Sequence, residues 1–178
     1  MTAPDRTRRL FFASWPDELT RRAVMRGSAE VLAAAGGRRV DPGGLHVTLA
    51  FLGSVAAGRV ADLEAVLRTV CEPAFEYRFD TIASWPGPRV LALTSRSVPA
   101  AALRLVERLW ALLQPLGFEP DTRPHRPHVT LARKIAGAPI RQPITPLVWP
   151  VRGIFLVESR TVAGGSAYTP IAAHELAV

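Results

Sequence analysis

Cysteine and lysine each occur only once in this chain of 178 residues. A single cysteine, Cys71, excludes an internal disulfide and cannot build a thiolate metal site. It stands at the end of an expected helix, where we predict a buried, small hydrophobic residue. Since Lys134 is the only lysine, arginine supplies the other cationic side chains of a chain with net charge +7. That excess favours an anionic partner such as nucleic acid or phosphate, although a GC-rich coding bias would also raise the arginine content.

Long apolar runs are also missing, and no segment approaches the roughly 18 residues of a membrane span. The basic segment 1–9 is followed only by the short apolar stretch 10–15 before two acidic residues, which is too little for a signal peptide. The 48% hydrophobic and 21% charged residues are typical of a folded globular protein. We therefore expect a cytoplasmic monomer without membrane contact, in which residues 1–178 form one domain of two closely packed lobes.

Hydrophobic periodicity predicts strands and helices in irregular alternation, which favours an α+β fold. The first helix is predicted to begin at a capping box from Ser14 to Asp17 and to end at Gly36 and Gly37. Residues 134–148 contain three prolines and are predicted to form a long loop. The other expected helices span 60–70 and 99–114, and the expected strands span 10–14, 45–52, 75–80, 90–94, 128–133, 154–158 and 167–176.

One pentapeptide, His-Val-Thr-Leu-Ala, begins at His46 and recurs in identical form at His128. Both copies lie in strand-like sequence, where successive side chains point to opposite faces. His46 and Thr48 are therefore expected on one face, as are His128 and Thr130, while the valine and leucine of each copy face the core. Two such strands side by side around a pseudo-twofold axis would bring both pairs to one cleft.

This set of side chains suits in-line attack on a phosphodiester, which needs a base for the nucleophile and an acid for the leaving oxygen. Histidine can fill either role near neutral pH because its unperturbed pKa is about 6.5. Threonine hydroxyls can hold the non-bridging oxygens, and an arginine can stabilise their charge. Arg133 follows Thr130 by three residues, so an ideal strand would turn it to the other face, and it reaches the cleft only if the strand ends or bulges. The scheme requires no metal and no cofactor.

Simpler explanations exist for each of these residues taken alone. A single strand histidine is more often an ordinary core or surface residue, and Thr48 and Thr130 are good strand formers. His125 and His128 have a spacing that could bind a metal, but no cysteine and few acids lie nearby to complete a site. His125 is expected in a loop, either exposed or near a bound anion, and His174 is expected to be structural.

Both copies have flanks that resemble a known family: Leu-His-Val-Thr-Leu-Ala-Phe-Leu-Gly at 45–53 and Arg-Pro-His-Val-Thr-Leu-Ala-Arg at 126–133. Further matching segments are Leu-Phe-Phe-Ala at 10–13, Pro-Asp-Glu-Leu at 16–19, Trp-Pro-Gly-Pro-Arg-Val at 85–90, Glu158 with Ser159, and Gly165 with Tyr168. Over nearly the whole chain they resemble the 2H phosphoesterase superfamily, specifically the bacterial RNA 2′,3′-cyclic phosphodiesterases once called 2′-5′ RNA ligases. The resemblance implies a bilobal α+β fold of two antiparallel sheets, related by a pseudo-twofold axis, with helices outside and a central cleft.

The resemblance also implies an activity, the metal-independent opening of 2′,3′-cyclic phosphate ends of RNA or oligonucleotides to 2′-phosphates. By position in the motifs, His46 would donate a proton to the 3′ leaving oxygen and His128 would accept one from water. Thr48, Thr130 and Arg133 would bind the phosphate.

Two other functions remain alternatives at this stage. A 2′-5′ RNA ligase would run the reaction in reverse with the same two histidines, although abundant water makes hydrolysis the default. A non-catalytic nucleotide- or RNA-binding module would keep the cleft, but the histidines present in both motifs argue against it. His125 departs from the family pattern, which usually has an aromatic residue there for stacking on substrate.

Overall fold

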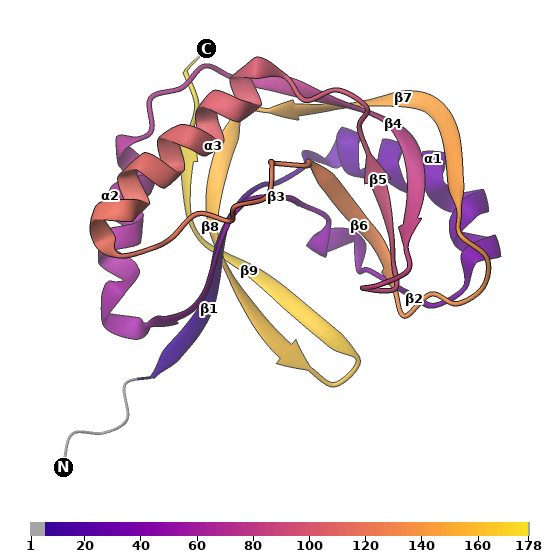
Figure 1. The fold of residues 1–178 in the computed structure, drawn as a ribbon, viewed down its shortest axis with the longest axis horizontal. Coiled ribbons are helices and arrows are strands. Elements are labelled where there is room, and N and C mark those ends of the chain that lie inside the picture. Colours follow the sequence, from indigo (N-terminus) through magenta and orange to yellow (C-terminus); the bar gives the residue numbers. More distant parts are fainter. Residues whose placement is uncertain (1–5, 178) are drawn as a thin grey trace.

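Nine strands and three α-helices make up residues 6–177, the part of the chain that the computed structural model describes (Figure 1). Residues 1–5, which begin the segment considered as a signal peptide, lie outside the described residues. The strands are β1 (Thr7–Ser14), β2 (Arg38–Arg39), β3 (Val47–Ala56), β4 (Phe75–Trp85), β5 (Val90–Thr94), β6 (His128–Arg133), β7 (Arg141–Val151), β8 (Gly153–Val162) and β9 (Gly165–Glu175). The helices are α1 (Glu18–Ala35), α2 (Val60–Thr69) and α3 (Ala100–Leu113), with 3-10 turns at Pro42–Gly44, Ala57–Arg59 and Gln114–Leu116. The predicted α+β class is confirmed.

The strands pair antiparallel in the order β7-β4-β5-β6-β3-β1-β8-β9, and the short β2 pairs with β6. Between β6 and β3 only Val47 and Val129 pair. The sheet therefore consists of two antiparallel halves, β7-β4-β5-β6 and β3-β1-β8-β9, whose strands pair at a single point. These halves correspond to the two antiparallel sheets that the family resemblance implies (Figure 1).

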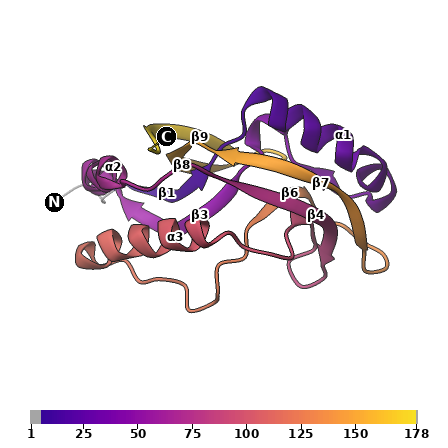
Figure 2. The same ribbon diagram turned by 90° about the horizontal axis from the view of Figure 1, so that it is seen from above.

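Helices cover both halves because each helix has an apolar face to bury. Helix α1 contacts β7 and β6, α2 contacts β8 and β9, and α3 contacts β3 and α2. Figure 2 shows α1 and α3 on opposite sides of the strands. One hydrophobic cluster includes Val24 of α1, Leu63 of α2 and Leu105 of α3, so the core is continuous across both halves.

The first helix begins later than the capping box predicts. Asp17 is its N-cap, and the Asp17 carboxylate accepts a hydrogen bond of 2.7 Å from the Thr20 amide. Ser14 is the last residue of β1 and is fully buried. Its hydroxyl accepts a hydrogen bond of 2.9 Å from the Trp149 indole, so it is engaged with the other half of the sheet rather than with the helix.

The predicted loop at 134–148 is wrong in its second part, because β7 begins at Arg141 and pairs with β4. β7 is an edge strand, and one of its sides needs no hydrogen-bond donor. Pro143 and Pro146 lack an amide proton, which an edge position tolerates and a central strand does not. Proline therefore misled the prediction.

Cys71 is exposed, so its predicted burial is also wrong. Val70, one residue earlier, is 2% exposed and takes the buried place where the chain leaves α2. In residues 6–177, no helix has both the length and the apolar character needed to cross a membrane.

Candidate active site

The two copies of the repeated pentapeptide meet where the two halves of the sheet join. Val47 and Val129, the second residue of each copy, form the joining pair, and both are fully buried. An antiparallel pair has a local twofold relationship about its centre. His46 and His128 each precede a paired valine, so the register carries them to symmetry-related places on one face. Both are half-buried, and the predicted division between core-facing and outward-facing residues is confirmed.

A β-bulge occurs at the same position in both copies. β1 has no partner for Leu49 in its pairing with β3, and β5 has none for Leu131 in its pairing with β6. An extra residue shifts the alternation of faces by one position. Arg133 therefore comes to the same face as Thr130. This is the bulge that Arg133 needs in order to reach the cleft.

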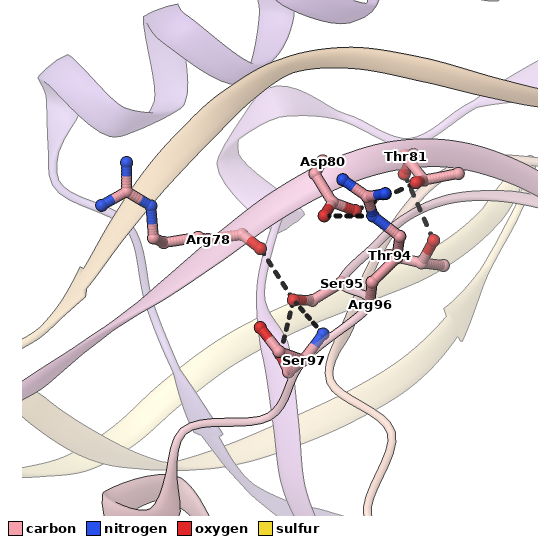
Figure 3. Close-up of polar contacts among 7 residues, drawn as sticks. All are labelled: Arg78, Asp80, Thr81, Thr94, Ser95, Arg96 and Ser97. Carbon is pink, nitrogen blue, oxygen red and sulfur yellow. Dashed lines mark hydrogen bonds and ion pairs between the residues drawn. The ribbon is translucent and has the colours of Figure 1, made fainter.

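Polar contacts brace the strand that lies beside His128 (Figure 3). Thr94 is opposite His128 in the β5–β6 register, and its hydroxyl donates to the Thr81 carbonyl oxygen at 3.3 Å. On the neighbouring strand, the carboxylate of Asp80 accepts a hydrogen bond of 2.8 Å from Arg96. These contacts join the middle of β4 to the C-terminal end of β5, where Thr94 lies opposite His128.

Both histidines are held in the same tautomer by backbone oxygens two residues earlier. The Nδ1 atom of His46 lies 2.7 Å from the Gly44 carbonyl oxygen, and that of His128 lies 2.9 Å from the Arg126 carbonyl oxygen. A carbonyl oxygen only accepts, so Nδ1 donates in both rings. The Nε2 atom of each ring is then the one available to exchange a proton.

Aromatic rings enclose His46. Its ring stacks on Trp15 at 5.4 Å between centroids and at an interplanar angle of 8°. Phe11 lies at 4.9 Å, and Tyr168 meets the ring edge-on at 4.7 Å. These contacts keep water from the imidazole and therefore disfavour its charged form.

Burial lowers the pKa of His46 to about 4, and the nearby positive charges of His128 and Arg133 act in the same direction. Burial also lowers the pKa of His128, again with a contribution from Arg133. His128 has one aromatic neighbour, Trp85, whose ring lies edge-on at 4.8 Å. Both shifts favour the neutral imidazole, and the positive charge of Arg133 contributes to both.

All five residues predicted for the site lie on these two strands or next to them. Thr48 belongs to β3, and His46 immediately precedes that strand. His128, Thr130 and Arg133 belong to β6, and all five side chains are half-buried.

The remaining two histidines have structural contacts. His125 is half-buried rather than exposed, and its Nε2 atom lies 3.3 Å from the Tyr77 hydroxyl oxygen. Burial lowers its pKa to about 4, with a smaller contribution from His128. His174 places Nε2 2.9 Å from the Val70 carbonyl oxygen and so joins β9 to the end of α2. Within residues 6–177, no three His, Cys, Asp or Glu side chains lie close enough together to hold a metal ion.

Sequence reasoning missed the aromatic walls of the site. The sequence assigns Phe11, Trp15 and Trp85 only to a strand or a turn. Tyr168 enters only through the resemblance, and no spacing along the chain connects it with His46. Their contacts arise when distant strands become neighbours.

The fold and the site together define a protein in which a repeated strand motif presents two histidines on one face where the two halves of the sheet join. The sequence profile of the 2′-5′ RNA ligase superfamily matches residues 15–162. The chain belongs to this superfamily, and the predicted 2H phosphoesterase membership is confirmed.

Similar proteins cover nearly the same length. The RNA 2′,3′-cyclic phosphodiesterase of Escherichia coli is 32% identical over 165 residues, which cover 92% of this chain and 93% of that protein. The protein of the same name from Thermus thermophilus is 34% identical over 173 residues, which cover 90% of this chain and 86% of that one. The crystal structure of E. coli LigT complexed with 3′-AMP matches with a TM-score of 0.85 and 29% identity, over 96% of this chain and 99% of that one.

Proposed function

We propose that this protein hydrolyses the 2′,3′-cyclic phosphate at the end of an RNA strand and leaves a 2′-phosphate and a 3′-hydroxyl. The observation that carries the proposal is the pair of histidines on one face, each with Nδ1 bound to a backbone oxygen and Arg133 beside them. The names of the two relatives support the same substrate class. So does the complex of LigT with 3′-AMP, because 3′-AMP is a ribonucleotide with a phosphate on its ribose.

The two imidazoles divide the proton transfers of the reaction. His128 takes a proton from water through Nε2 while the water oxygen forms a bond to phosphorus. The bond between phosphorus and the 3′ oxygen breaks, and the protonated Nε2 of His46 donates its proton to that oxygen. One proton enters and one leaves the histidine pair, so the products are the 2′-phosphate and the free 3′-hydroxyl.

Arg133 and the two threonines bind the phosphoryl oxygens in this scheme. Negative charge accumulates on the non-bridging oxygens during attack, and a guanidinium stabilises it through charged hydrogen bonds. The hydroxyls of Thr48 and Thr130 lie on the same face and donate to those oxygens. The alternation of side chains along each strand supports this role for the threonines, and the bulge at Leu131 supports it for Arg133.

His46 must gain a proton before it can act as the acid. Its pKa of about 4 keeps it neutral at pH 7 in the free protein. A bound phosphate anion favours the imidazolium, because an opposite charge within a few ångströms raises the pKa of a histidine. Substrate binding and protonation of His46 are therefore coupled, and phosphate should bind more tightly as the pH falls from 8 to 6.

The decisive assay uses an RNA oligonucleotide that ends in a 2′,3′-cyclic phosphate, incubated with the protein in EDTA. Phosphorus NMR distinguishes the 2′-phosphate from the 3′-phosphate product. We expect only the 2′-phosphate, and no product with the double variant His46→Ala/His128→Ala. A 3′-phosphate product would refute the assigned regiochemistry, and an unchanged cyclic end would refute the proposed activity.

We further propose that the protein works as a cytoplasmic monomer of one domain. The continuous core supports a single domain, and all five site residues come from one chain. Light scattering at working concentration should give the mass of one chain, 19.3 kDa.

A further inference from the structure

A pocket of about 500 Å³ lies beside His46, between β2, the turn at Pro42–Gly44 and the β8–β9 hairpin. Its size is in the range of pockets that bind small ligands. Three arginines line it, Arg38, Arg39 and Arg133. The site described above uses only one of them.

The pocket is continuous with the histidine site through shared residues. Gly44 lines the pocket, and its carbonyl oxygen binds Nδ1 of His46. Tyr168 lines the pocket and packs against the His46 ring. The guanidinium of Arg133 lies 3.4 Å from the Tyr168 hydroxyl oxygen, where the two sites meet. A group that extends from a ligand at His46 can therefore enter the pocket directly.

The pocket carries an excess of positive charge. Within residues 6–177, none of its three arginines forms an ion pair with a carboxylate, whereas Arg8 and Arg160 both bind Glu158. Arg38 donates to the Gly164 carbonyl oxygen, which neutralises no charge. The pocket has one acidic residue, Asp41, whose carboxylate accepts a hydrogen bond from the Gly43 amide.

The chemistry of the substrate indicates what this charge binds. In the terminal nucleotide, the ring carbon that bears the 5′ substituent is bonded to C3′, whose oxygen receives the proton from His46. The strand therefore leaves the ribose on the His46 side, where the pocket lies. We infer that the pocket binds the phosphodiester that joins the terminal nucleotide to the rest of the strand, so that the substrate is an RNA strand rather than a lone nucleoside cyclic phosphate. Arginine suits this role because its planar guanidinium can donate two parallel hydrogen bonds to two oxygens of one phosphate. The inference rests on the proposed function.

Three substrates with the same cyclic end test the inference: a nucleoside 2′,3′-cyclic phosphate with a 5′-hydroxyl, its 5′-phosphorylated form and a dinucleotide. We expect kcat/KM to be at least about tenfold higher for the last two, the size expected of charged hydrogen bonds. The dinucleotide advantage should shrink with added KCl. In the double variant Arg38→Gln/Arg39→Gln, the dinucleotide advantage in kcat/KM should fall at least about fivefold. The control variant Arg104→Gln/Arg108→Gln removes the same charge from exposed positions of α3, and its dinucleotide advantage should equal that of the wild type.

The exposed Arg39 offers a second variant that does not disturb the contact of Arg38 with the hairpin. Arg39→Gln should reduce the dinucleotide advantage in the same direction, with an unchanged circular dichroism melting curve. Equal kcat/KM for all three substrates would refute the inference and leave the proposed hydrolysis intact, as would an advantage that both pocket variants retain. An advantage confined to the 5′-phosphorylated nucleoside would refute binding of a strand. Failure to open any cyclic phosphate would refute the proposed function and the inference together.

Discussion

Arg133 of β6 and Tyr168 of β9 belong to different halves of the sheet, yet a guanidinium nitrogen of Arg133 lies 3.4 Å from the Tyr168 hydroxyl oxygen. The contact joins the two halves beside the histidines and holds the guanidinium near both rings. Arg133→Gln should lower kcat/KM about 10- to 100-fold, because it removes a charged hydrogen bond. Tyr168→Phe keeps the ring against His46 and should cost less than about tenfold, mainly in KM. Steady-state kinetics on a dinucleotide cyclic phosphate would measure both, and a larger loss for Tyr168→Phe would contradict the order.

The histidine pair should behave as one catalytic unit. His46→Ala and His128→Ala should each lower kcat by about 10²–10⁴, the usual contribution of a positioned acid or base. The double variant should lose less than the product of the two, since either loss already prevents the coupled proton transfers. His174→Ala is the matched control, a histidine of the same sheet bound to a backbone oxygen, and it should retain activity. Full activity in either site variant would place the chemistry elsewhere.

An activated leaving group separates the acid from the base. Bis(p-nitrophenyl) phosphate releases an anion that scarcely needs protonation, so His46→Ala should be partly rescued on this substrate. His128→Ala should not be, because water still needs a base. The measurement is the ratio of kcat/KM between variant and wild type, determined on the nitrophenyl ester and on the cyclic phosphate. Rescue of His128→Ala instead would make His128 the acid and His46 the base.

Stability should fall as the solution is acidified from neutrality. The pKa values of His46 and His125 are lowered from 6.5 to about 4 by burial, and that of His128 is lowered too. Between pH 6.5 and 4 the unfolded chain binds more protons, so the stabilisation is complete above 6.5 and is lost on the way to 4. Urea unfolding should give a free energy roughly 2 kcal/mol or more lower at about pH 5 than at about pH 7.5.

Two comparisons identify the groups responsible for the loss of stability at acidic pH. The pKa of Glu158 is held at about 2 by Arg8 and Arg160, so this carboxylate contributes to the loss only below pH 4.5. His46→Ala should reduce the difference between the neutral and the acidic measurement, because one of the groups responsible is absent. Equal unfolding free energies at both pH values would show that the imidazoles are not desolvated in the folded protein.

The two halves of the sheet should unfold together. They hydrogen-bond through one strand pair, but they share one hydrophobic cluster, and the buried Trp149–Ser14 hydrogen bond links them. Calorimetry should show one transition with equal calorimetric and van't Hoff enthalpies. Two resolved transitions would mean that the halves are separate domains.

Much of the site follows from the sequence because its geometry is local. The alternation of side chains along a strand places His46 with Thr48, and the identical second copy places His128 with Thr130. The α+β class follows in the same way from periodicities of a few residues. Arg133 marks the limit of this reasoning, because its orientation depends on a bulge at Leu131 that only the pairing with β5 defines.

Strand order and packing decided the rest. Pro143 lies in a strand because β7 is an edge, and an edge exists only once the sheet is assembled. Tyr168 reaches His46 because β9 pairs with β8 in one half of the sheet, and Arg38 reaches the pocket because β2 pairs with β6 of the other half. The pKa of His46 likewise depends on rings from β1 and β9. Desolvation and contacts between distant segments are properties of the packed chain, and the order of residues alone does not contain them.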